Sequence, residues 1–238
     1  MISIIVCGAK GRMGQNILEL LKGDKTLRLS YACDLDTPLQ NGIETGEVVI
    51  DFSTPPATLK HIEICEKNKK PIVIGTTGFT PEQKKNIGAS AKKIPVILSS
   101  NMSIGVNVLW HLIAEASKTL GPDFNISISE THHIHKKDKP SGTAKTMSEV
   151  VEQIRKNLPR IESIREGEVV GDHTILFETA RECLKITHHA KAREIFAEGA
   201  ITAARWILDK KPGLYDMRDV LSLVSSSHAV GGDLKQKK

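Results

Sequence analysis

Short apolar runs alternate with amphipathic stretches along the first part of the chain. The apolar runs fall at residues 2–7, 27–33, 47–52, 71–74 and 94–98. Nearly continuous apolar runs of this length are typical of strands buried on both faces of a parallel sheet. Between them, apolar residues recur at helical spacing over residues 13–21, 57–68 and 81–92. The alternation predicts an α/β fold, a doubly wound parallel sheet with helices on both faces.

The pattern changes after residue 103. A helix is predicted over residues 104–120, and further helices over 143–157 and 191–210. Strand patterns follow at 124–131, 161–166, 173–178 and 182–187. Strands that succeed one another without a helix between them indicate a mixed or antiparallel sheet, and therefore a second, α+β domain. We expect a first domain over residues 1–102, a second over 103–210, and residues 211–238 docking back on the first.

Residues 39–46 are too short and too rich in glycine for a crossover helix. We therefore expect an abbreviated link between the second and third strands.

Composition narrows the class of protein. The 238 residues carry a net charge of +5, but the basic residues are dispersed and aromatic residues are only 4%, which disfavours a nucleic-acid surface. An anionic small substrate and a phosphate-bearing cofactor explain the excess equally well. No apolar run approaches the roughly 20 residues of a membrane span, and no signal peptide is recognised, so we expect a cytoplasmic protein. The four cysteines include no Cys-x-x-Cys pair and are interpreted as reduced, mostly buried thiols.

A glycine-rich turn follows the first strand and opens the first helix. Gly8, Gly11 and Gly14 let the backbone approach a pyrophosphate closely, while the helix presents its free N–H groups. Asp34 lies twenty residues past Gly14, at the end of the second strand, where a carboxylate binds the ribose hydroxyls of NAD. The alternative is a purely structural turn. The spacing favours a Rossmann-like dinucleotide site for NADH or NADPH.

The charges around this turn bear on the choice of cofactor. Asp34 repels a ribose phosphate, whereas Lys10 and Arg12 offer it a partner. We expect NADH to be preferred and NADPH tolerated.

Two polar turns end the fourth and fifth predicted strands. They comprise Gly75, Thr76 and Thr77, and Ser99, Ser100, Asn101 and Met102. Ligands of open parallel sheets bind beyond the carboxyl ends of the strands. We expect these turns to line the nicotinamide side of the cofactor, although each by itself is also compatible with an ordinary loop.

Residues 130–144 combine three histidines, three lysines and a Pro-Ser-Gly-Thr turn. Histidine donates a proton near neutral pH, and lysine adds fixed charge and a second donor. A metal site at His132, His133 and His135 is disfavoured, because neighbouring residues of an extended chain point in different directions. A solvated polar loop is the other alternative. Gly142 and Thr143 open a helix whose free N–H groups would bind an anion, so we expect a pocket for a carboxylate-bearing substrate.

The chain resembles the 4-hydroxy-tetrahydrodipicolinate (dihydrodipicolinate) reductase family of lysine synthesis. The resemblance covers nearly the whole chain and is carried by residues 6–14, 51–55, 75–79, 101–108, 130–144, 171–174, 193–197 and 213–217. The stretch His-His-x-x-Lys-x-Asp-x-Pro-Ser-Gly-Thr is highly specific to that family, whereas the glycine turn is not.

The resemblance implies a two-domain reductase of the diaminopimelate route, usually a homotetramer built through the sheet of the second domain. Hydride would pass from the nicotinamide to a cyclic imine dicarboxylate, giving tetrahydrodipicolinate. His132 and Lys136 would be the proton donors, and His133, Lys136, Gly142 and Thr143 would hold the carboxylates. The pyrophosphate would lie on Gly8, Ala9, Lys10, Gly11, Arg12 and Met13, the ribose on Asp34, and the nicotinamide beside the two polar turns. No membrane, nucleic-acid or metal partner is implied.

Two positions depart from the family pattern. Lys139 stands before Pro140 where a small residue is usual, and Leu35 follows Asp34 where a basic residue sometimes occurs. The second departure leaves the NADH/NADPH ratio open. The competing hypotheses are a related dehydrogenase of another small amino or keto dicarboxylate, and a dinucleotide sensor without catalysis. The Pro-Ser-Gly-Thr run and the retained His132 and Lys136 disfavour them.

Overall fold

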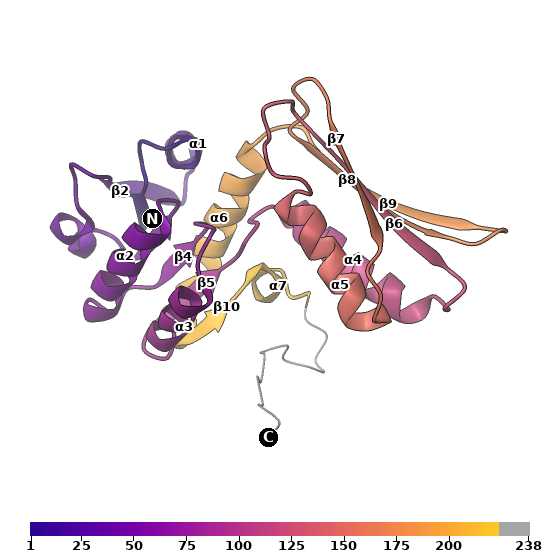
Figure 1. The fold of residues 1–238 in the computed structure, drawn as a ribbon. Helices are drawn as coiled ribbons and strands as arrows, with labels where there is room; N and C mark the ends of the chain where they lie inside the picture. The colour runs from indigo at the N-terminus through magenta and orange to yellow at the C-terminus, as the bar shows by residue number, and fades with distance from the viewer. Residues whose placement is uncertain (224–238) are drawn as a thin grey trace.

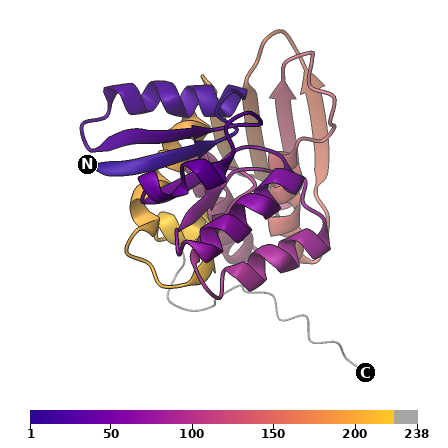
Figure 2. The same cartoon turned by 90° about the vertical axis from the view of Figure 1, so that its left-hand side faces the viewer.

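The computed structural model describes residues 1–223, which form two sheets in separate halves of the molecule (Figures 1 and 2). Within these residues the first sheet has six parallel strands in the order β2-β1-β3-β4-β5-β10. The strands are β1 (Ile2–Cys7), β2 (Leu27–Cys33), β3 (Val48–Asp51), β4 (Ile72–Ile74), β5 (Pro95–Leu98) and β10 (Gly213–Tyr215). The chain leaves β1 toward one edge and returns on its other side at β3, so the switch point of the sheet lies between β1 and β3.

Alternate residues of the strands enter two separate cores. On one face, Ile4 and Val6 pack against α1 (Arg12–Gly23), α6 (Glu194–Ile207) and α7 (Met217–Val220). On the other face, Ile5 and Cys7 pack against α2 (Pro55–Lys67) and α3 (Pro81–Ser90). Both sets are fully buried, which explains why the strands read as continuous apolar runs. The expected doubly wound α/β fold is confirmed.

Helix α6 packs on this first sheet, although residues 103–210 were expected to form the second domain. Its alanine-rich face lies in the core formed by Ile4, Val6 and Ile50. Gly199 permits the close approach, because a Cβ there would lie 1.8 Å from the carbonyl oxygen of Met102. Helical periodicity indicates that one face of α6 is buried, but not which sheet covers that face.

The link between β2 and β3 is abbreviated, as expected. It consists of two 3₁₀ turns, η1 (Leu39–Asn41) and η2 (Ile43–Thr45), whose first residues are buried. At the other edge of the sheet, β10 pairs with β5. Residues 211–238 were expected to dock on the first domain, and β10 does so through this pairing. The expectation for residues 224–238 falls outside the residues that the structure describes.

The second sheet is mixed, with four strands in the order β7-β6-β8-β9 in the described chain. Its strands are β6 (Asn125–His132), β7 (Arg160–Arg165), β8 (Gly171–Glu178) and β9 (Cys183–Ala190). Strand β6 runs parallel to β7 and antiparallel to β8. Helices α4 (Ile104–Thr119) and α5 (Gly142–Arg155) cover one face (Figure 1). None of the helices within residues 1–223 combines the length and apolar character needed to traverse a bilayer.

Candidate active site

The glycine turn lies at the switch point between β1 and β3. Gly8 has a φ of +76°, and a Cβ there would lie 2.5 Å from the carbonyl oxygen of Phe52. A Cβ at Gly14 would lie 2.2 Å from the carbonyl oxygen of Gly8. Neither position accommodates another residue without moving the backbone. Gly11 occupies the N-cap of α1, so no side chain caps the start of this helix. The first N–H groups of α1 are therefore available to phosphate oxygens.

Asp34 lies beside this turn. One carboxylate oxygen accepts the N–H of Lys10 at 2.8 Å, and the other accepts the N–H of Leu35 at 2.9 Å. The Nζ of Lys10 pairs with Asp36 at 2.7 Å on the surface. The turn and the carboxylate therefore have the arrangement that a dinucleotide requires, pyrophosphate on the helix start and ribose beside the second strand.

The two polar turns beyond β4 and β5 divide into buried and exposed residues. Thr76 is buried, and its hydroxyl receives a hydrogen bond from Thr58 at 3.1 Å. Ser99 is buried too and donates to the carbonyl oxygen of Asn101 at 2.8 Å. Thr77 and Ser100 are exposed. The buried hydroxyls shape the turns, whereas the exposed ones remain accessible to a ligand.

Asn101 connects the two halves of the molecule. Its side-chain amide donates to the hydroxyl of Thr143 at 3.2 Å, at the start of α5. The N-cap of that helix is Ser141, whose hydroxyl accepts the N–H of Ala144 at 3.2 Å. In the described chain a Cβ at Gly142 would meet no heavy atom within 4 Å. The helix start at Gly142 and Thr143 thus stays open to an anion beside the contact with Asn101.

His132 is enclosed within the second half rather than open to solvent. Its Nδ1 contacts Glu130 Oε2, and its Nε2 faces Gly171, where a Cβ would lie 2.9 Å away. The other oxygen of Glu130 lies 3.0 Å from Arg165 Nη1. Burial lowers the pKa of His132, and Glu130 only partly opposes this. The imidazole is therefore mostly neutral near pH 7, with Nδ1–H donated to the carboxylate.

His173 stands next to His132, with ring centroids 5.0 Å apart and ring planes nearly perpendicular. Its Nε2 lies 3.1 Å from the hydroxyl of Ser141. Burial, followed by the nearby His132, lowers the pKa of His173 to about 4. Glu130, His132 and His173 place one donor atom each within 4.8 Å of the others. These atoms are already engaged with one another, with Ser141 and with the cationic Arg165, which disfavours a metal ion there.

Lys136 and His133 lie nearer the surface. The Nζ of Lys136 is 3.0 Å from Asp138, and its side chain is 24% exposed. His133 Nε2 accepts from Arg193 Nη2 at 3.2 Å. His133 and Arg193 line a cleft of about 640 Å³ together with Lys10 and Arg12 of the glycine turn. The cleft brings the first half of the predicted site against the second.

Sequence reasoning missed several residues of this arrangement. Glu130 had no assigned role, and Arg165, His173 and Arg193 were not candidates. Glu130 opens the histidine-lysine run, and His173 and Arg193 lie in segments that carry the family resemblance, which was the available signal. Arg165 gave no such signal, because it reaches Glu130 only through the pairing of β7 with β6.

Comparisons with known proteins show which family the chain is similar to. The family models "Dihydrodipicolinate reductase, N-terminus" and "Dihydrodipicolinate reductase, C-terminus" match residues 2–102 and 105–221. A 4-hydroxy-tetrahydrodipicolinate reductase of Geotalea uraniireducens is 40% identical, covering 94% of this chain and all of the relative. One from Methanoculleus marisnigri is 38% identical with the same coverage.

Solved structures show the same fold. A dipicolinate-bound dihydrodipicolinate reductase from Paenisporosarcina sp. TG-14 superposes with a TM-score of 0.80 at 22% identity, covering 91% of this chain and 97% of that one. An aspartate dehydrogenase from Thermotoga maritima gives a TM-score of 0.52 at 14% identity, with 89% and 98% coverage. With both halves matched by its models and near-complete relatives at this level of identity, the chain belongs to the dihydrodipicolinate reductase family.

Proposed function

We propose that this chain reduces 4-hydroxy-tetrahydrodipicolinate to tetrahydrodipicolinate with NADH or NADPH, in the diaminopimelate route to lysine. One observation carries the proposal: the cleft that joins the glycine turn to the histidine-lysine loop. Lys10 and Arg12 line it from the first half, and His133 and Arg193 from the second. A reductase needs this juxtaposition, because the hydride donor and its acceptor bind on different domains.

The substrate side of the cleft suits a dicarboxylate. The start of α5 at Gly142 and Thr143 would bind one carboxylate with backbone N–H groups. The second carboxylate would be bound by His133 and Lys136, which offer donating or cationic groups. Arg193 lies beside His133 and adds a further positive charge. Dipicolinate, named in the Paenisporosarcina structure, is a ligand of this class.

The reaction releases the 4-hydroxyl group of the substrate as water, adds a hydride to a ring carbon and adds a proton to the rest of the conjugated system. The bound dinucleotide supplies the hydride. Lys136 is the direct proton donor in this proposal, since its ammonium group is partly exposed and held by Asp138. His132 is the second donor in this proposal, and because its imidazole is mostly neutral near pH 7 it must first take up a proton at Nε2. The imidazole of His132 is enclosed beside Gly171. Glu130 contacts its Nδ1 and is itself held by Arg165, and these contacts fix the orientation of the ring.

A coupled assay tests the activity. Substrate is made fresh by the preceding condensation enzyme, and the absorbance of NADH or NADPH is followed after this protein is added. We expect absorbance to fall with both cofactors. If absorbance stays constant with each of them while the protein is folded and binds dinucleotide, the proposal is wrong and the sensor hypothesis replaces it.

The cofactor preference follows from Asp34. Its carboxylate would accept ribose hydroxyls and repel a ribose phosphate, and Lys10 is already paired with Asp36. We infer a higher kcat/KM with NADH than with NADPH. Replacing Asp34 with serine should move the ratio toward NADPH, whereas an unchanged ratio would contradict this assignment.

We also infer a homotetramer built through the second sheet. Its face away from α4 and α5 carries Ser129, Thr174 and Thr187 in one cross-strand row, with the two threonine hydroxyls 3.0 Å apart. Small side chains of this kind allow two sheets to stack closely. Light scattering after gel filtration should give four times the chain mass, and Thr174→Arg should reduce it. A wild-type monomer would refute this inference. The cytoplasmic location stays part of the proposal and is tested by cell fractionation.

A further inference from the structure

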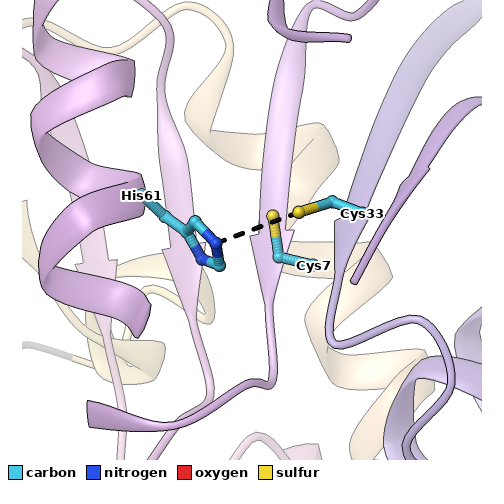
Figure 3. A group of neighbouring side chains, drawn as sticks. All are labelled: Cys7, Cys33 and His61. Carbon is cyan, nitrogen blue, oxygen red and sulfur yellow. Dashed lines mark hydrogen bonds between the residues drawn. The ribbon is translucent and has the colours of Figure 1, made fainter. Parts of the chain in front are cut away.

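Three side chains with metal-binding atoms meet on the α2 side of the first sheet (Figure 3). Cys7 ends β1, Cys33 ends β2, and His61 lies in α2. The two cysteines are register partners on neighbouring parallel strands. Their sulfurs and a ring nitrogen of His61 all lie within 4.8 Å of one another. The group brings together two strands and a helix that are distant in sequence.

Asp51 fixes the orientation of the imidazole. His61 Nδ1 lies 2.9 Å from Asp51 Oδ2, and the other carboxylate oxygen accepts the N–H and hydroxyl of Ser53 at 2.8 and 2.6 Å. His61 Nε2 is thereby turned toward Cys33, 3.9 Å from its sulfur. A carboxylate that holds one nitrogen of a histidine and directs the other toward a metal is a recurrent arrangement in zinc sites.

We propose that Cys7 Sγ, Cys33 Sγ and His61 Nε2 bind one Zn²⁺ ion. Zinc bonds of about 2.3 Å to sulfur and about 2.0–2.1 Å to nitrogen, at tetrahedral angles, separate the two donors by about 3.6 Å. The observed 3.9 Å between Cys33 and His61 requires only a small contraction.

The donor set selects the class of ion. Two thiolates and an imidazole suit zinc, whereas magnesium and calcium require oxygen ligands. Three protein ligands leave a fourth position of the tetrahedron for a further ligand.

The position of the group in the fold gives the ion a structural consequence. Cys7 immediately precedes Gly8, and Cys33 immediately precedes Asp34. The N–H groups of Gly8 and Ala9 also donate to the carbonyl oxygen of Cys33, at 3.0 and 3.1 Å. A zinc ion would therefore cross-link β1, β2 and α2 directly beneath the turn assigned to the dinucleotide.

Cobalt(II) is the probe, since it replaces zinc and absorbs visible light. The full chain is reduced with a phosphine, stripped of metal and titrated with Co²⁺ in the absence of substrate and dinucleotide. We expect thiolate-to-cobalt charge-transfer absorption and tetrahedral d–d bands that saturate at one equivalent and disappear when Zn²⁺ is added. Cys7→Ser, Cys33→Ser and His61→Gln should each abolish the saturating signal.

Matched controls separate this group from the other cysteines and histidines. Cys65 is buried on the same helix, and Cys183 is exposed on β9. Cys65→Ser, Cys183→Ser and His173→Gln should keep the full spectrum. Asp51→Asn should weaken zinc binding by about 10–100-fold, because the imidazole loses its orienting partner.

Two outcomes overturn the proposal. One is wild-type protein that shows the circular dichroism of the native fold but develops no charge-transfer band. The other is a band that persists unchanged in Cys7→Ser and Cys33→Ser, or that is lost in Cys65→Ser while that variant stays folded. Neither result depends on catalysis, so each is distinguishable from a failure of the proposed reductase activity.

Discussion

Glu130 contacts His132 with one carboxylate oxygen and Arg165 with the other, the latter at 3.0 Å. The Glu130–Arg165 ion pair is nearly excluded from solvent. The side chain of Glu130 is 0% exposed, and that of Arg165 is 8% exposed. Arg165 also donates to the carbonyl oxygen of Lys136 at 3.2 Å. One buried ion pair therefore fixes the imidazole of His132 and the backbone of the loop that carries Lys136. The geometry of the two proposed proton donors and the stability of the second half therefore depend on the same contacts.

Replacing Arg165 with methionine should destabilise the protein. The change leaves the carboxylate of Glu130 buried without its cation, a situation that costs about 3–5 kcal/mol. Urea unfolding of wild type and variant at neutral pH measures the difference. Arg181→Met, at an exposed turn between β8 and β9, is the matched control and should change stability by about 0.5 kcal/mol or less. Equal effects of the two substitutions would show that the Glu130–Arg165 pair has no special role.

Replacing Lys136 with alanine should lower kcat strongly and leave dinucleotide affinity nearly unchanged. The expected loss is about 10²–10⁴-fold, the usual contribution of a positioned proton donor. Lys137→Ala removes a neighbouring exposed lysine and should retain most activity. Steady-state kinetics and fluorescence titration with NADH provide the two readouts. A collapse of NADH affinity in the Lys136 variant would mean that this lysine serves the cofactor rather than the substrate.

His173 should make the protein less stable as the pH falls. Its pKa is about 4 in the folded chain, against an ordinary value of 6.5, because burial disfavours the charged ring. Between these pH values the unfolded chain binds a proton that the folded chain does not, so the free energy of unfolding decreases as the pH falls from 6.5 toward 4. The decrease from this group reaches up to about 3 kcal/mol.

Chemical denaturation of wild type and His173→Gln at a series of pH values isolates this contribution. The variant should lose less stability than wild type between pH 6.5 and 4, and the two should differ by a constant amount above that range. Parallel curves across the whole series would contradict the assignment.

Replacing Gly14 with alanine should weaken dinucleotide binding and destabilise the first half. The added Cβ would lie 2.2 Å from the carbonyl oxygen of Gly8, so the turn has to move. Gly88 lies within α3 and in the described chain has no heavy atom within 4 Å of an added Cβ. Gly88→Ala should instead stabilise the protein by about 0.5–1 kcal/mol. Thermal unfolding and NADH titration compare the two variants, and unchanged NADH affinity in Gly14→Ala would exclude the turn as the pyrophosphate site.

The sequence by itself predicted the features that depend on neighbouring residues, namely the buried strands, the glycine turn and the histidine-lysine run. The apolar runs of β1 to β5 follow from burial on both sheet faces, and the turn at Gly8, Gly11 and Gly14 from the lack of space for side chains. The histidine-lysine run was recognisable because its residues are contiguous. In each case the signal lies within one element and its turn, where periodicity and steric limits act.

The tertiary structure alone decided which elements meet. The sequence of helix α6 indicates a buried face, yet only the fold places that face on the first sheet. The contact of Arg165 with Glu130 depends on the register of β7 against β6. The cysteines were interpreted from sequence only as reduced, mostly buried thiols, and Cys7, Cys33 and His61 meet because strand order and helix packing bring them together. Contacts between distant segments are set by packing of the whole chain, which no local pattern encodes.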